Sequence, residues 1–422
     1  MPAAAAKLLG CLFCFVLVLS SCAFGQAAPV TLGDLIATAL QNSPELKAAE
    51  AKAAAMAQKV PMEGSLMDPM LSVGYQNEGL KKYTYGESPD AQWMFSLAQT
   101  YPWPGKRTLQ EEAATLDADA EKASAEMVRR EVIVKVTQAY YDLVLITKEL
   151  DLIRARRPLI EHMEDIALKR YAAGTLSQDE VLMAQAEKYM LQEAQEMAMS
   201  RKETAEAMIR QTVGGTDPAP LGRPVEYLPT VFAYTQDELI DQANRESPEI
   251  RMREKLMLAS AQRFERSKKD AWPDVTVMGK YSSRGGGLGD MAELTLSIPL
   301  PLYYKNRQGA GISEASWMNA SAQKELDASK FKAASEIRDN LAMIHAAERI
   351  MQLYRNALLP KSRQVIDAAL ASFSSGRLEA SMALAKLKVP FDYELTAWQQ
   401  QVLREKAIAR IKALTGDLEA QR

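Results

Sequence analysis

Few residues of this chain have the types and spacings that catalysis or metal binding requires. Its three cysteines, Cys11, Cys14 and Cys22, all lie within the first 25 residues, so the rest of the chain has no thiol for a disulfide, a zinc site or a nucleophile. The two histidines, His162 and His345, are far apart and lack a paired ligand spacing such as His-x-x-x-His. Phosphate-binding loops, dinucleotide fingerprints and Ser-His-Asp groupings are also missing from the sequence. We therefore expect no catalytic residue, no cofactor and no metal site, and we expect that the protein is not an enzyme.

One cysteine could still be modified. Residues 1–25 have the pattern of a signal peptide, with Lys7 before an apolar run from Leu8 to Leu19 that is too short to span a bilayer. The segment Leu19-Ser20-Ser21-Cys22 matches a bacterial lipobox, in which Cys22 is acylated and becomes the first mature residue. The alternative is ordinary signal-peptidase cleavage before Gln26.

The composition excludes some partners and favours helices. The 422 residues include 51 Lys and Arg against 54 Asp and Glu, a net charge of −3, which argues against a nucleic-acid partner. Aromatic residues are only 7 %, and long stretches are rich in Ala, Glu, Lys, Leu and Gln, which is typical of helical proteins. Beyond residue 25, no apolar run reaches the length of a membrane helix.

The chain is internally duplicated. Ser43-Pro44-Glu45 recurs 204 residues later as Ser247-Pro248-Glu249. Further along, the offset is 202, and it matches Pro158 with Pro360 and Gly174 with Gly376. Repetition at a steady offset is typical of tandem structural repeats. We predict two repeats, residues 26–214 and 235–422, joined by a linker over 215–234.

Each repeat is predicted to begin with an amphipathic helix, over residues 31–66 and 235–270. The matched Ser-Pro-Glu lies inside it, and its proline predicts a break or restart, because proline removes a helix hydrogen bond. Two segments with period two follow, polar on one face and apolar on the other, which indicates strands between two different media. They are clearest from Val275 to Tyr281 and from Leu294 to Leu300, and weaker around residues 70–75 and 93–101.

A very long helix is predicted after the first strand pair, from about Thr108 to the turn at Gly174, and a shorter helix returns to about Val213. Its apolar residues have the 4-3 spacing of a coiled-coil seam. They are Val132, Val136, Ala139, Leu143, Ile146, Leu150 and Ile153. At 1.5 Å per residue the long helix spans roughly 100 Å, about as much as the two shorter helices end to end. This predicts a mainly α fold with a small β part, and the wall of a cylinder rather than a globule.

In this order of elements the chain resembles the TolC family of outer-membrane efflux proteins. The resemblance rests on the Ser-Pro-Glu helix of each repeat, on strand pairs that end in proline-rich exits, and on the two glycine turns. These turns read Arg170-Tyr171-Ala172-Ala173-Gly174-Thr175 and Phe373-Ser374-Ser375-Gly376-Arg377. The resemblance implies a homotrimer in which four strands per chain form a twelve-stranded barrel in outer-membrane lipid and the helices form a tunnel across the periplasm. Four short strands agree with this, because they cannot close a barrel alone.

The function that the resemblance implies is a passive exit duct in the outer membrane of a Gram-negative bacterium. Small molecules or metal ions would be supplied by an inner-membrane pump through a periplasmic adaptor protein. The rival hypothesis is a periplasmic coiled-coil scaffold lipoprotein without a pore. The sequence does not indicate the cargo.

The resemblance also implies that the glycine turns contact the adaptor. The residues concerned are Arg170, Tyr171, Gly174, Thr175, Phe373, Gly376, Arg377 and Leu378. A purely structural turn would explain the glycines, since glycine readily adopts positive φ. We nevertheless expect the apolar neighbours, Phe373 and Leu378 among them, to be exposed at the tips, where such side chains mark interaction surfaces.

Two further features have both a functional and a plain interpretation. Pro158 and Pro360 each lie 16 residues before a glycine turn, and predict helix kinks near the tunnel entrance or inherited kinks without a role. Members of the family often narrow this entrance with acidic side chains. The nearest acidic residues here are Asp179, Glu180 and Glu379, which are equally explained as solvated charges on helix faces.

Overall fold

The computed structural model describes residues 29–215, 221–225 and 229–416. The predicted signal peptide, with Cys22, lies outside the described residues, as do residues 216–220 and 226–228 of the predicted linker. The described chain divides into two compact units. Unit 1 takes its residues from 1–39, 136–230 and 350–402, and unit 2 from 40–135, 231–349 and 403–422. Each unit contains parts of both predicted repeats, so the repeat boundaries at 26–214 and 235–422 stay a prediction.

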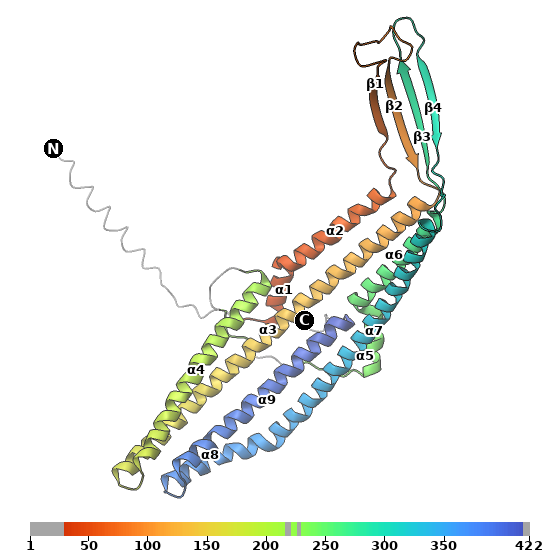
Figure 1. The fold of residues 1–422 in the computed structure, drawn as a ribbon. Helices are drawn as coiled ribbons and strands as arrows, with labels where there is room; N and C mark the ends of the chain where they lie inside the picture. Colours follow the sequence, from red (N-terminus) through yellow and green to blue (C-terminus); the bar gives the residue numbers. More distant parts are fainter. Residues whose placement is uncertain (1–28, 216–220, 226–228, 417–422) are drawn as a thin grey trace, which may run out of the picture. The chain divides into compact units, whose positions relative to one another are not determined.

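Unit 2 contains a four-stranded antiparallel sheet (Figure 1). Its strands are β1 (Met70–Gln76), β2 (Gln92–Tyr101), β3 (Val275–Ser283) and β4 (Met291–Ser297), in the order β1-β2-β3-β4. All four predicted strands are confirmed, but the prediction of a strand up to Leu300 was wrong, since β4 ends at Ser297. The reason is that Pro299 and Pro301 have no N–H groups with which to continue the ladder.

Two pairs of helices explain the repeated Ser-Pro-Glu. The predicted helix over 31–66 is two helices, α1 (Leu32–Asn42) and α2 (Pro44–Gly64), and that over 235–270 is α5 (Gln236–Glu246) and α6 (Pro248–Lys269). Each proline is the first residue of its helix, where a missing N–H costs nothing. The hydroxyl of Ser43 accepts the Leu46 N–H at 3.4 Å and so caps α2.

The glutamates of the same motif tie the second helix of each repeat to the following long helix. Glu45 lies 3.0 Å from the ammonium group of Lys135 on α3 (Lys106–Ala172). Glu249 lies 3.1 Å from that of Lys332 on α7 (Gln308–Leu353). The predicted break is thus confirmed. In both repeats the motif supplies a helix start and an ion pair, and in the first repeat it also supplies a cap.

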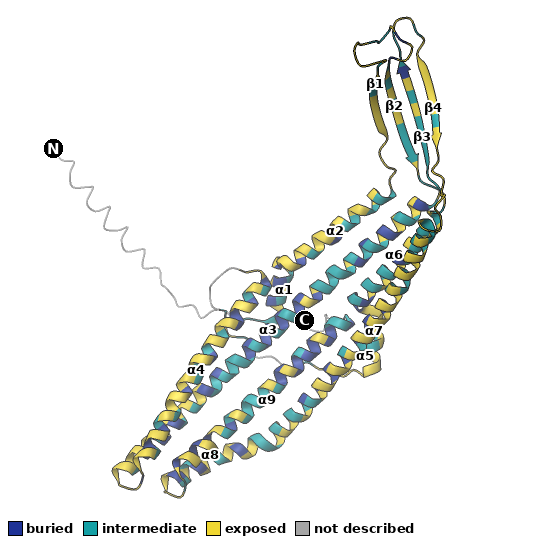
Figure 2. Ribbon diagram, in the orientation of Figure 1, coloured by how far each residue is buried: buried dark blue, intermediate teal, exposed yellow. Residues whose placement is uncertain are grey.

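Unit 1 is helical. It holds the last part of α3, together with α4 (Gln178–Val213), the π-helix η1 (Tyr354–Leu358), α8 (Leu359–Ser374) and most of α9 (Ala380–Thr415). Its core includes Leu150, Ile153, Ile160, Met163, Leu191, Phe373, Leu384 and Leu387. Figure 2 shows α4 exposed along much of its length, with buried residues at intervals. The predicted seam of α3 is confirmed as buried at all its positions except Ile146, which is half-buried.

The matched prolines lie in different local structures. Pro158 is inside α3, which stays a single helix of 67 residues. Pro360 is the second residue of α8, which directly follows η1, and the wider turn of η1 is typical of a helix that is interrupted. The predicted role of both prolines in shaping an entrance stays a prediction.

Candidate functional site

Two helical hairpins of unit 1 carry the residues that the sequence singled out, and their turns are built alike. α3 and α4 are joined around Gly174, and α8 and α9 around Gly376, with φ values of 72° and 77°. In the first turn, the Gly174 N–H donates to the Tyr171 carbonyl at 2.9 Å. In the second, the Gly376 N–H donates to the Phe373 carbonyl at 3.1 Å. The last carbonyls of a helix lack partners within the helix. A glycine with left-handed backbone angles can donate its N–H to one of them.

Arg170 joins the first hairpin to the second. Its Nη1 donates to the Phe373 carbonyl at 2.8 Å, and its Nη2 donates to the Thr175 carbonyl at 3.1 Å. The same guanidinium lies 5.2 Å from the centre of the Phe373 ring, within the range of a cation–π contact. A Cβ placed on Gly376 would lie 3.3 Å from Nη2 of Arg170. Gly376 therefore serves both the turn and the approach of Arg170.

Glu180 makes a second link between the hairpins. One carboxylate oxygen accepts the backbone N–H of Ala380, the first residue of α9, at 3.0 Å. The other accepts the Ser177 hydroxyl at 3.2 Å. A carboxylate at a helix N-terminus satisfies a donor that lacks a partner and interacts favourably with the helix dipole. Of the three acidic residues that were singled out, Glu180 is half-buried in this role, while Asp179 and Glu379 are exposed.

The exposure of the turns differs from the prediction. Tyr171 is 47 % exposed, and Gly174, Thr175, Gly376 and Arg377 are exposed as well. Phe373, expected at the surface, has no exposed area, and Leu378 is half-buried. The prediction of exposed apolar neighbours was therefore wrong for Phe373. It packs into the unit 1 core beneath the guanidinium of Arg170, a residue too distant in sequence for a local pattern to reveal.

The sheet of unit 2 has two chemically different faces. In the observed register, Leu97 lies opposite Leu71 and Phe95 lies opposite both Val73 and Tyr281. The same face also carries Tyr75, Trp93, Tyr101, Val275, Val277, Leu294 and Leu296. The other face carries serines, threonines and the ion pair of Lys280 with Glu293, interspersed with four methionines. Alternation of this kind is that of a strand with lipid on one side and a polar interior on the other.

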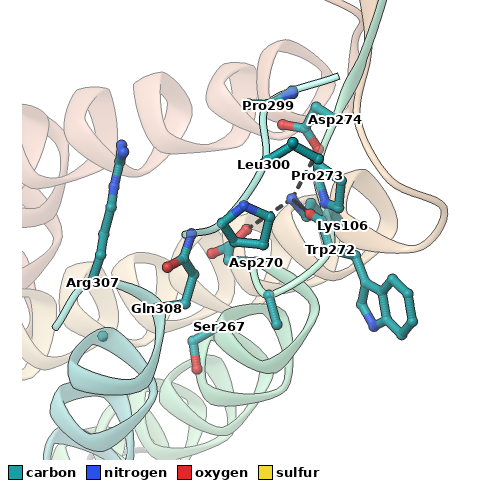
Figure 3. Close-up of a pocket in the computed structure, with 13 residues that line it drawn as sticks. Lys106, Ser267, Asp270, Trp272, Pro273, Asp274, Pro299, Leu300, Arg307 and Gln308 are labelled. Carbon is teal, nitrogen blue, oxygen red and sulfur yellow. Dashed lines mark hydrogen bonds and ion pairs between the residues drawn. The ribbon is translucent and has the colours of Figure 1, made fainter. Parts of the chain in front are cut away.

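A buried lysine with two carboxylate partners lies where the strands of unit 2 meet its helices, and the sequence patterns did not reveal it. Lys106, the first residue of α3, is 7 % exposed. Its ammonium group lies 2.8 Å from Asp274, 3.4 Å from Asp270 and 2.8 Å from the Trp272 carbonyl (Figure 3). The aspartates on either side of Pro273 were the available signal, since a buried lysine needs such partners.

The electrostatics of this cluster favour the ion pair. Partial burial favours a higher pKa for the Asp274 carboxyl, but hydrogen bonds from the Lys106 ammonium and the Trp103 N–H outweigh it and lower the pKa. Trp103 also stacks on Trp272, with ring centres 5.1 Å apart. The segment after β2 is thereby fastened to the segment before β3.

The described residues contain no group of three His, Cys, Asp or Glu side chains that could hold a metal ion. Within the same residues, no helix combines the length and the apolar character that a membrane-spanning helix needs.

Comparisons with known proteins agree with this architecture. Residues 35–215 match the family model described as outer membrane efflux protein. Curated proteins give no match. Among solved structures, the outer membrane protein VceC of Vibrio cholerae superposes with a TM-score of 0.77 at 18 % identity, over 91 % of this chain and 96 % of that one.

Two further structures have the same fold. CusC, described in terms of transmembrane channel formation, gives a TM-score of 0.79 at 14 % identity, over 92 % of this chain and 93 % of that one. The CmeC outer membrane channel of Campylobacter jejuni gives 0.76 at 15 % identity, over 91 % and 85 %. Residues 35–215 are thus similar to the outer membrane efflux protein family, and the chain as a whole has the fold of these solved outer membrane proteins, in which each chain contributes helices to a tunnel and four strands to a β-barrel.

Proposed function

We propose that this protein is the outer-membrane exit duct of a tripartite efflux system and that it works as a homotrimer. The observation that carries the proposal is the sheet. It has an apolar and a polar face, and in the described chain nothing pairs with the outer edges of β1 and β4. Open strand edges are not tolerated in hydrocarbon, so further copies have to supply the missing neighbours. Three copies of four antiparallel strands give the even number that such barrels have.

A scaffold lipoprotein without a pore, the rival hypothesis, has no use for such a sheet. The duct is passive in this proposal, because the sequence offers no nucleotide-binding motif that could supply energy. Small molecules or metal ions would be delivered by an inner-membrane pump through a periplasmic adaptor. The adaptor would contact the hairpin tips through their exposed residues, Tyr171, Thr175 and Arg377.

Adjacent residues on opposite faces of β2 test the barrel. Leu97→Arg places a charge on the apolar face, and at the middle of a bilayer this costs about 2–4 kcal/mol. Ser96→Arg places the same charge on the polar face. We expect purified wild-type trimer to form conducting pores in planar bilayers. Leu97→Arg should largely fail to insert, while Ser96→Arg should insert with altered conductance and ion selectivity. Equal behaviour of the two variants, or a wild-type protein without conductance, would refute the proposal.

A second pair of variants tests the adaptor contact. Tyr171→Ala removes an exposed side chain at the tip, and Tyr189→Ala removes one that is 69 % exposed farther along α4. We expect Tyr171→Ala to reduce co-purification of the adaptor and efflux activity while the trimer stays intact. Tyr189→Ala should leave both unchanged. A tip variant that binds adaptor as the wild type does would remove Tyr171 from the contact.

A further inference from the structure

The two junctions at which strands pass into long helices are covered very differently. In the first junction, from β2 to α3, Lys106 is buried among Asp270, Asp274 and the Trp272 carbonyl. The second junction, from β4 to α7, is exposed, with Leu302 at 81 % and Tyr303 at 78 %. Equivalent segments of a duplicated chain have similar packing needs. The second junction therefore lacks packing partners like those that bury Lys106 in the first.

Arg307 has a place in the second repeat like that of Lys106 in the first. Each is a basic residue between a proline-rich exit and a long helix, since α3 begins at Lys106 and α7 begins immediately after Arg307. Arg307 is exposed, and in the part of the chain that the structure describes no carboxylate forms an ion pair with it. Its side chain lies apart from Lys106, Asp270 and Asp274 (Figure 3). The guanidinium is therefore available to a group outside this cluster.

The repeat indicates what that group is. Lys106 is held by the segment before β3, around Trp272 and Pro273. Pro273 corresponds to Pro69 at the 204-residue offset, so the counterpart of Trp272 is Asp68 before β1. Asp68 is exposed, and it too has no ion-pair partner among the described residues. Trp272 binds Lys106 through its backbone carbonyl. Its counterpart Asp68 offers a backbone carbonyl and, in addition, a carboxylate.

These two residues belong to opposite edges of the sheet. Asp68 leads into β1 and Arg307 follows β4, and β2 and β3 lie between these strands. The edge strands are equally long, with seven residues each. Antiparallel pairing of β4 with β1 of another copy would place the helix-side ends of both strands together, as β2 and β3 are placed within the chain.

We propose that Arg307 pairs with Asp68 of the partner subunit, so that the exposed junction after β4 is closed by the segment before β1 of the next copy. The inference rests on the trimer of the proposed function. The contact is head-to-tail, and its repetition closes a ring. The guanidinium suits this place because it can bind a carboxylate with two parallel hydrogen bonds. Three such pairs alternate around the ring with the three buried Lys106 clusters.

Charge reversal tests the pair. Arg307→Glu and Asp68→Arg should each lower the temperature at which purified trimer dissociates into monomers, and the double variant should regain most of the loss. Lys324→Glu is the matched control, because Lys324 is 82 % exposed at its side chain and pairs only locally with Asp327. It should leave the dissociation temperature unchanged. Single reversals that behave like this control, or a double variant no better than the singles, would overturn the pairing.

Disulfide trapping separates this inference from the trimer itself. A chain with both Asp68→Cys and Arg307→Cys should, under mild oxidation, give covalently linked dimers and trimers. Each single-cysteine variant controls for disulfides to Cys22. Cross-links confined to single chains, or absent from a wild-type-like conducting trimer, would overturn the pairing and leave the proposed function standing. A wild-type protein that is monomeric would overturn both.

Discussion

Replacing Phe373 with alanine should loosen the second helical hairpin far more than the equivalent change at Tyr171 loosens the first. The two aromatic residues precede Gly376 and Gly174 by the same distance, but Phe373 has no exposed area and Tyr171 is 47 % exposed. Truncating a buried phenylalanine costs about 3–5 kcal/mol. Loss of the contact with the Arg170 guanidinium adds about 0.5–1 kcal/mol.

Amide hydrogen exchange of the purified protein, without adaptor, measures this difference locally. At 1.4 kcal/mol for each factor of ten, Phe373→Ala should lower protection in α8 and the start of α9 by about 300-fold to about 20,000-fold. Tyr171→Ala should change protection in α4 by less than about tenfold, since substitutions at exposed sites are mostly small. Equal losses in the two hairpins would contradict the burial of Phe373 and the packing of Arg170 over it.

Three further predictions concern unit 2. Lys106→Met removes a buried ammonium group together with its bonds to Asp274 and to the Trp272 carbonyl and should lower stability by about 1–3 kcal/mol in denaturant titration, whereas Lys122→Met, at a side chain 64 % exposed, should be neutral. Because its pKa is lowered in the folded state, Asp274 contributes stability that is complete above the unfolded carboxyl pKa of about 3.9 and is lost as the pH falls through the folded value. As the pH is lowered from about 5 to about 2, the melting temperature should therefore fall more steeply for the wild type than for Asp274→Asn. Ser43→Ala should cost about 1 kcal/mol by thermal melting, and Ser247→Ala less, because only Ser43 makes the side-chain cap bond.

Local signals in the sequence predicted the parts of the fold that local physics determines. Pro44 and Pro248 start helices because proline fits the first helical position, and the glycine turns need the positive φ that glycine supplies. Alternation along β3 predicted one apolar and one polar face of the sheet, and this needed no knowledge of the neighbouring strands.

Contacts between residues that are far apart in the sequence could not be predicted from local patterns. Phe373 is buried because Arg170, 203 residues earlier, lies over its ring and bonds its carbonyl. Lys106 was overlooked because its carboxylate partners lie more than 160 residues away and form no motif with it. The adaptor contacts, the prolines and the acidic residues near the turns remain predictions, since their roles depend on partners.

The links made by Arg170 and Glu180 determine how the hairpins of one chain can move. Spreading the two tips apart has to break, together, the bond from the Arg170 guanidinium to the Phe373 carbonyl and the carboxylate bond that holds the first residue of α9. Bonds to charged groups are worth about 1.5–3 kcal/mol each. A displacement that carries the two hairpins as one body breaks none of them. A tunnel mouth built from such chains can therefore widen along the seams between copies without loss of these bonds.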